Sequence, residues 1–188
     1  MKNNAEGIFE KAGAILKGHF LLTSGLHSPV YWEKFKVLQY PSYTEPLCRL
    51  IADHFRQQQI EVVAAPTTGG IILAFEVARQ LGVRGIFAEK VGEKERAFRR
   101  GFTINPGEKV LIVDDVLTTG KSIREVIAAV EELKGKIVGI GVLVDRSEQN
   151  IDFGFPLFSC LRVETVAYSP EDCPLCAARI PLVKPGGG

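Results

Sequence analysis

Two adjacent carboxylates, Asp114 and Asp115, lie between an apolar run and a short polar turn, an order that favours recognition of a phosphorylated sugar. Residues 110–113 before them predict a buried strand, and residues 122–133 after the turn predict an amphipathic helix. The start of such a helix directs backbone N–H groups and its positive end toward one point, which can hold a phosphate. Neighbouring carboxylates accept hydrogen bonds from adjacent sugar hydroxyls. We therefore expect phosphate and ribose to be bound together.

The same segment has two other interpretations. It can be an ordinary strand end whose two carboxylates are solvated. Gly120, Lys121 and Ser122 also resemble the end of a P-loop, but a P-loop needs a glycine five residues before Gly120, where this chain has Asp115. A triphosphate site of that type is therefore excluded.

The composition predicts one domain with a small attachment. Of 188 residues, 46% are hydrophobic and 24% charged, and 23 Lys+Arg balance 22 Asp+Glu to a net charge of +1. This balance argues against a nucleic-acid or membrane partner. The apolar runs are shorter than the roughly 20 residues of a membrane span, and residues 1–6 are polar and lack a signal-peptide pattern. We expect a cytoplasmic protein.

Residues 41–168 alternate between helix and strand patterns, which predicts an α/β core. Near-continuous apolar strands indicate a doubly wound, mostly parallel sheet covered by helices on both faces. The expected helices are residues 44–59, 70–81 and 122–133, and the expected strands are 62–65, 85–88, 109–113 and 137–144. The paired carboxylates then lie at the carboxyl edge of the sheet, where such folds bind ligands.

Residues 1–40 and 169–188 are expected to form smaller parts outside this core. The spacing of apolar residues predicts a helix over 5–16 that stops near Gly18. Extended patterns over 20–22 and 30–37 predict a hairpin. At the C-terminus we expect a short helix over 171–178 and then a poorly ordered tail.

Residues 89–101 are rich in charge and poor in apolar side chains, so they can add little to a core. Connections of this length inside compact domains are often functional or mobile. The segment is therefore either a lid over the site or a solvated hairpin.

Cys173 and Cys176 have the spacing of a metal-binding pair, but zinc sites usually combine two such pairs. The nearest third cysteine is Cys160, in a predicted strand. We therefore interpret the cysteines, with Cys48, as reduced packing thiols and assign no protein metal ligands, with structural zinc as the less favoured alternative.

Residues 110–122 resemble, at each of thirteen positions, the phosphoribosyl-pyrophosphate signature of the type I phosphoribosyltransferases. The flanking segments resemble the orotate phosphoribosyltransferases, and residues 173–186 follow the C-terminal pattern of one branch of them. The resemblance covers nearly the whole chain. It implies a type I phosphoribosyltransferase fold in which residues 1–40 and part of the C-terminus form a hood over the base. It also implies transfer of the phosphoribosyl group to orotate, giving orotidine monophosphate and pyrophosphate in UMP synthesis.

The resemblance also assigns roles to individual residues. It implies catalytic roles for Lys90, Asp114 and Asp115. The residues expected to bind phosphoribosyl pyrophosphate are Asp114, Asp115, Val116, Leu117, Thr118, Thr119, Gly120, Lys121, Ser122, Thr68 and Gly69. Those expected to bind orotate are Thr118, Arg146, Ser24, Tyr31 and Trp32. A planar, bidentate guanidinium at position 146 suits the orotate carboxylate.

Several of these residues have plainer alternatives. Arg146 can be a surface ion-pair residue, Tyr31 and Trp32 can be core aromatics, and residues 65–70 can form an ordinary strand-to-helix turn. The chain also departs from the family, which has lysines at the positions of Thr23 and Gly69 and a histidine in its mobile loop. Possible substitutes for that histidine, besides Lys90, are Lys94, Arg96, Arg99 and Arg100.

The resemblance implies Mg²⁺ as cofactor and a homodimer in which the loop lysine serves the neighbouring subunit's site. Two rival functions remain open. One is a phosphoribosyltransferase for a purine base, against which Arg146 argues because it suits a carboxylated base. The other is a non-enzymatic regulator that binds phosphoribosyl pyrophosphate and controls RNA or DNA, against which the near-zero charge argues.

Overall fold

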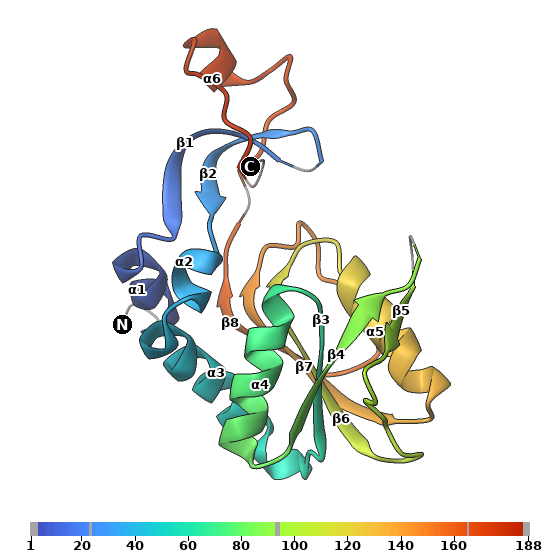
Figure 1. The fold of residues 1–188 in the computed structure, drawn as a ribbon. Coiled ribbons are helices and arrows are strands. Elements are labelled where there is room, and N and C mark those ends of the chain that lie inside the picture. The colour runs from blue at the N-terminus through green and yellow to red at the C-terminus, as the bar shows by residue number, and fades with distance from the viewer. Residues whose placement is uncertain (1–3, 23, 93–94, 165, 186–188) are drawn as a thin grey trace.

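A six-stranded sheet forms the centre of the molecule (Figure 1). The structure, a computed structural model, describes residues 4–22, 24–92, 95–164 and 166–185. The strands are β3 (Val62–Pro66), β4 (Arg84–Lys90), β5 (Arg96–Phe98), β6 (Lys109–Leu117), β7 (Lys136–Asp145) and β8 (Leu157–Arg162), in the order β5-β4-β3-β6-β7-β8. All neighbours pair in parallel except β4 and β5.

Helices cover both faces of this sheet, which confirms the expected α/β fold. On one face pack α3 (Pro41–Phe55), its 3-10 extension η1 (Arg56–Gln58) and α4 (Gly69–Leu81), and on the other packs α5 (Lys121–Glu132). The buried apolar residues 62–65 of β3 and 110–113 of β6 explain the central place of these strands, because a strand covered on both faces needs apolar side chains on both. None of the helices in the described part of the chain combines the length and apolarity needed to cross a bilayer.

The N-terminal elements differ in two places from the sequence prediction. The helix α1 (Asn4–Lys11) ends before Gly13, whose φ of +61° breaks the helix. Ile15 and Leu16, predicted as helical, instead begin β1 (Ile15–Leu21), which pairs with β2 (His27–Trp32) as the expected hairpin. The predicted strand 30–37 was also too long, because a short helix, α2 (Phe35–Leu38), follows β2.

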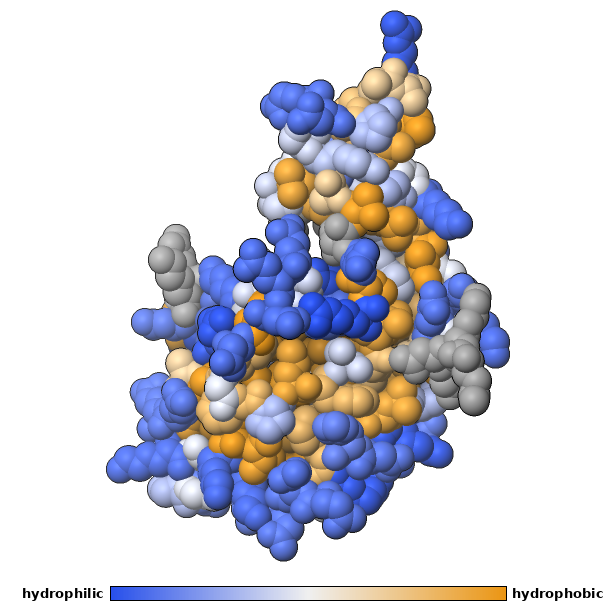
Figure 2. Space-filling view, turned by 180° about the vertical axis from the view of Figure 1, so that it is seen from behind, coloured by the Kyte–Doolittle hydropathy of each residue, from blue (hydrophilic) through white to orange (hydrophobic). Residues whose placement is uncertain are grey.

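The hairpin and the C-terminal segment together form a projection, which we define as residues 15–32 and 166–185. It stands above the main sheet in Figure 1 and rises from the body when seen from behind, with apolar surface on both parts (Figure 2). Backbone hydrogen bonds join the two segments: Val183 bonds His19 and Leu21, and Tyr168 bonds His27. The C-terminal segment carries α6 (Pro174–Ala177), shorter than predicted, and backbone hydrogen bonds hold it to the hairpin as far as Val183. The tail beyond residue 185 lies outside the described residues.

Candidate active site

A cavity of about 240 Å³ opens where β6 ends and α5 begins. Its lining includes every residue from 116 to 122, all of which the sequence predicted to bind phosphoribosyl pyrophosphate. Lys90, at the end of β4, lines the same cavity together with Arg96 and Glu125. Residues far apart in the chain are therefore brought together at the carboxyl edge of the sheet, as the fold class predicts.

Gly120 shapes the turn that forms the floor of this cavity. Its φ of +75° lies in the left-handed region, and an added Cβ would lie 2.8 Å from the ring of Phe153. Only glycine fits this position without strain. It precedes the first residue of α5, where the first N–H groups have no partners within the helix. The Lys121 N–H donates to the Thr119 hydroxyl at 3.4 Å. Such a helix start attracts a phosphate.

Asp114 is buried beside the cavity and held by two hydrogen bonds. The Ser122 hydroxyl donates to its Oδ2 at 2.7 Å, and the Asp115 N–H donates to its Oδ1 at 2.8 Å. Both carboxylates lie inside β6, which the sequence predicted to end at Val113. Burial, followed by the negative charge of Asp115, raises the pKa of Asp114 to about 7. A carboxylate that titrates in this range and lies at a cavity is typical of a functional site.

Lys34 is a site residue that was not predicted from the sequence. Its Nζ lies 2.7 Å from Oδ2 of Asp115, so the start of α2 supplies a cation to the acidic pair. Gly69 touches the same oxygen from the other side: a Cβ there would lie 1.8 Å from Asp115 Oδ2. A side chain at position 69 would require Asp115 to shift, so the arrangement seen here depends on glycine at the position where the family has lysine.

Arg96 fixes the turn after β3 and the β4–β5 hairpin to α5. It is buried and donates to Oε2 of Glu125 at 3.0 Å, to the Thr67 hydroxyl at 3.0 Å and to the Ala88 carbonyl at 3.1 Å. Residues 89–101 thus contain the hairpin that was one of the two expected alternatives, with Lys90 opposite Arg96. Lys94, one of the candidate substitutes, lies outside the described residues. Arg96, another, is committed to a structural ion pair.

The residues predicted to bind orotate lie next to the cavity or on the projection. The backbone N–H of Arg146 donates to the Leu117 carbonyl at 2.8 Å, which places Arg146 beside the phosphate turn. Burial lowers the pKa of Arg146, and the Tyr31 phenol opposes that shift. The ring of Trp32 packs edge-on against that of Phe9, with 5.4 Å between the ring centroids. Trp32 thus packs against the core, which was one of the two roles considered for it from the sequence.

Ser24 is exposed in the turn of the hairpin, and Thr68, at the start of α4, is exposed as well. Thr23 lies outside the described residues. The geometry thus unites the phosphate turn, the acidic pair, Gly69 and Lys90 closely. It leaves the base-binding roles of Ser24, Tyr31, Trp32 and Arg146 as predictions.

Comparisons with known proteins show the family of this chain. A family model described as the phosphoribosyl transferase domain matches residues 41–176. An orotate phosphoribosyltransferase of Pelotomaculum thermopropionicum is 54% identical over 179 residues, covering 95% of this chain and 94% of the relative. One of Caldanaerobacter subterraneus subsp. tengcongensis is 52% identical with the same coverage. The crystal structure of orotate phosphoribosyltransferase from Aeropyrum pernix superimposes with a TM-score of 0.68 at 27% identity, covering 84% of this chain and 93% of that one.

Proposed function

Because the chain belongs to the phosphoribosyl transferase family, we propose that it is an orotate phosphoribosyltransferase. It transfers the phosphoribosyl group of phosphoribosyl pyrophosphate to orotate and releases orotidine monophosphate and pyrophosphate, a step in UMP synthesis in the cytoplasm. The observation that carries this function is the buried acidic pair beside the cavity at the start of α5, in a chain more than half identical to proteins of that name.

Each part of the sugar phosphate finds a matching group. The N–H groups and hydroxyls of residues 118–122 bind the 5-phosphate, because they converge where the positive end of α5 lies. Asp114 and Asp115 accept hydrogen bonds from the two ribose hydroxyls. The backbone at Thr68 and Gly69 approaches the pyrophosphate, since it lies against the acidic pair.

The reaction exchanges one bond at the anomeric carbon. A ring nitrogen of orotate supplies the electron pair of the new C–N bond and gives up its proton to water. The bond to the pyrophosphate oxygen breaks, with its electrons leaving on pyrophosphate. Lys90 opposes the negative charge that develops on this leaving group. Arg146 orients orotate by pairing with its carboxylate, which Tyr31 and Thr118 help to position.

Mg²⁺ fits the donor set of this site. Asp114, bonded to the cavity residue Ser122, and Asp115 offer hard carboxylate oxygens, the ligand type Mg²⁺ takes together with substrate phosphates and water. When bound, Mg²⁺ neutralises charge on the pyrophosphate leaving group. The residues of the chain hold and orient the sugar around it.

A substrate panel tests the function. The full chain, with Mg²⁺ and phosphoribosyl pyrophosphate, is mixed separately with orotate, uracil, adenine and hypoxanthine, and pyrophosphate release is followed. We expect rapid release with orotate alone. Release with adenine or hypoxanthine instead would identify a purine enzyme. Binding of phosphoribosyl pyrophosphate without release with any base would identify a regulator.

Lys90→Ala should lower kcat roughly 100-fold, because a cation facing the leaving group acts mainly in the transition state. Stability should change by less than about 0.5 kcal/mol, since Lys90 is exposed. Lys136→Ala, at the opposite end of the sheet, is the matched control and should keep full activity. Steady-state kinetics and thermal melts measure both effects. A kcat of Lys90→Ala close to wild type would remove this residue from the mechanism.

Arg146→Ala should raise KM for orotate roughly 10- to 100-fold, the effect of losing one charge-assisted pair, with little change in KM for phosphoribosyl pyrophosphate. Arg146→Lys should recover only part of the loss, because a lysine cannot make the bidentate contact. Calorimetric titration with orotate checks the binding step directly. An unchanged affinity for orotate in Arg146→Ala would show that Arg146 does not bind the base.

The proposed assembly is a homodimer with shared active sites. Apolar surface for self-association is available on α4, where Phe75 is 69% and Ile72 37% exposed. In the single chain Lys90 lines the cavity of its own site. In the proposed dimer, Lys90 of one subunit acts instead in the active site of the other subunit. Mixing the inactive variants Lys90→Ala and Asp114→Asn should therefore restore about a quarter of wild-type activity, because half of randomly formed dimers then contain one intact site. No recovery on mixing would assign Lys90 to its own chain.

A further inference from the structure

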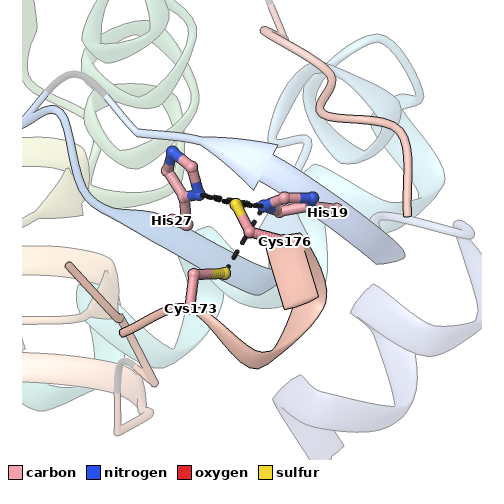
Figure 3. Close-up of side chains that lie close together, drawn as sticks. All are labelled: His19, His27, Cys173 and Cys176. Atoms are coloured by element: carbon pink, nitrogen blue, oxygen red, sulfur yellow. Dashed lines mark hydrogen bonds between the residues drawn. The ribbon is translucent and has the colours of Figure 1, made fainter. Parts of the chain in front are cut away.

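Four potential metal ligands meet in the projection (Figure 3). They are His19 from β1, His27 from β2, and Cys173 and Cys176 at the two ends of one turn around α6. Their ligand atoms all lie within 4.8 Å of one another, and the first three residues are buried. Cys160, the third sulfur that the sequence suggested, lies elsewhere and contacts the Leu47 carbonyl.

The polar contacts of this cluster converge on one nitrogen, Nε2 of His19. His19 Nδ1 lies 2.8 Å from the Ile180 carbonyl, which can only accept, so Nδ1 carries a proton. His19 Nε2 then offers a single lone pair, or a single hydrogen atom in the charged ring. It faces three partners at once: His27 Nδ1 at 2.9 Å, Cys173 Sγ at 3.5 Å and Cys176 Sγ at 3.7 Å. One lone pair or one hydrogen cannot serve three neighbours.

A cation at the centre would satisfy all four atoms together. With Zn–N bonds of about 2.0–2.1 Å and Zn–S bonds of about 2.3 Å, a tetrahedral site places nitrogen and sulfur about 3.5 Å apart. Three of the four nitrogen–sulfur distances here are 3.5, 3.7 and 3.3 Å, and the fourth, from His27 to Cys173, is within 4.8 Å. The N–N distance of 2.9 Å is shorter than the roughly 3.3 Å of such a site and requires only a small outward shift of one ring.

The surroundings also hold the ligands as a metal site requires. The contact from His19 Nδ1 to Ile180 fixes the tautomer and leaves Nε2 to face the cluster, the outer-shell support that ligating histidines usually have. His27 is fixed by paired backbone hydrogen bonds to Tyr168, at 2.9 and 2.8 Å. Both histidines therefore present one defined nitrogen to the cysteines, as Figure 3 shows.

We propose that His19, His27, Cys173 and Cys176 bind one structural Zn²⁺ ion. Two thiolates and two imidazoles are a ligand set that selects zinc, and four protein ligands leave no position open for substrate, so the site is structural. Both thiols lose their protons on binding, and the two thiolates balance the charge of the ion. Zinc binding replaces our interpretation of Cys173 and Cys176 as packing thiols.

The ion would join the two ends of the chain. The projection is small and stands off the main sheet, so it can bury little apolar area of its own, and small units of this kind commonly need a metal or a disulfide. Zinc at this position ties the C-terminal segment to the hairpin that carries Ser24, Tyr31 and Trp32. It is separate from the transferase chemistry, so its test does not depend on the proposed function.

Metal analysis of the full chain, without an affinity tag or chelator during purification, tests the site. We expect about one zinc per chain, and cobalt exchanged into the site should show tetrahedral d–d bands and thiolate-to-cobalt charge transfer. Cys176→Ser, at an exposed position, should lose most of the zinc, whereas Cys160→Ser should keep it. The cobalt spectrum is measured on the wild-type chain, so it does not depend on whether a variant folds.

Three results would overturn the zinc site. The first is a fully reduced wild-type chain that takes up neither zinc nor cobalt. The second is a Cys173→Ser/Cys176→Ser variant that retains zinc at the wild-type level. The third is a Cys173–Cys176 disulfide in the metal-free protein as purified, found by peptide mass mapping. As a second expected result, zinc removal by a chelator should speed hydrogen exchange in residues 15–32 and 166–185 while β6 and α5 stay protected.

Discussion

Asp114→Asn should lower kcat/KM for phosphoribosyl pyrophosphate roughly 100- to 1,000-fold while making the protein more stable. The loss of activity follows because an amide is a weaker acceptor than a carboxylate for the ribose hydroxyls, at a site where such contacts act in the transition state. The amide keeps the size of the side chain and can still bond Ser122 and the Asp115 N–H, so the turn should keep its shape.

The gain in stability has a defined pH dependence. The pKa of Asp114 is about 7 in the folded chain, against about 3.9 for an aspartate in water. Between these values the unfolded chain has released the proton and the folded chain still holds it, so wild-type stability falls as pH rises through this window. Asp114→Asn should not show this fall in stability, because asparagine does not ionise. It should be more stable than wild type by roughly 1–3 kcal/mol above about pH 7, and nearly equal to it below about pH 4.

The pH dependence of activity should also reflect the titration of Asp114, but activity should rise with pH where stability falls. Wild-type kcat/KM should rise as pH increases through about 7, because the ionised carboxylate is the form that accepts the ribose hydroxyls. The variant should lack this rise. Asp53→Asn, the same change at an exposed position of α3, is the control for both measurements. If thermal melts across this pH range show Asp114→Asn less stable than wild type at pH 8, ionisation of the buried Asp114 does not destabilise the folded chain as we describe.

Arg96→Met should destabilise the protein by about 3–5 kcal/mol. Arg96 and Glu125 are 5% and 7% exposed, so removing the guanidinium leaves a buried carboxylate on α5 without its hydrogen-bonded cation. The remaining cation, Lys121, is exposed, and its Nζ lies 3.9 Å from Glu125 Oε1. The Thr67 hydroxyl and the Ala88 carbonyl lose a donor as well. Urea denaturation of the wild type and the variant measures the difference.

A neighbouring arginine provides the comparison. Arg100 pairs with Glu89 on the same hairpin, but its side chain is 65% exposed, so Arg100→Met should cost less than about 1 kcal/mol. The double variant Arg96→Met/Glu125→Met should recover much of the loss of the single variant, because apolar residues of similar size replace a buried pair well. A loss below about 1 kcal/mol for Arg96→Met would mean that water reaches Glu125 and that the hairpin is not fixed by this pair.

The phosphate turn and the acidic pair could be predicted from the sequence because all their parts are local. Strand, carboxylates, turn and helix follow one another within residues 110–133, and the buried strand explains why they end at one edge of the sheet. The exact end of β6 could not be read in the same way. It runs on to Leu117 because β7 continues beside it, pairing Leu117 with Asp145, and that contact depends on tertiary structure.

Contacts between residues far apart in the chain could not be predicted from the sequence. The pair of Lys34 and Asp115 forms because α2 packs near the end of β6, and nothing in the residues around Lys34 indicates it. The cluster of two histidines with Cys173 and Cys176 joins positions up to 157 residues apart. A cysteine pair alone does not indicate which residues supply the other two metal ligands. Here they are His19 and His27, which lie on neighbouring strands and form no recognisable motif with the cysteines.

A crystal structure of the chain soaked with phosphoribosyl pyrophosphate and Mg²⁺ tests the central claim most directly. We expect the 5-phosphate on the N–H groups of residues 118–122, and the two ribose hydroxyls on Asp114 and Asp115. Density for the sugar phosphate at any other place, with the turn before α5 empty, would contradict the account.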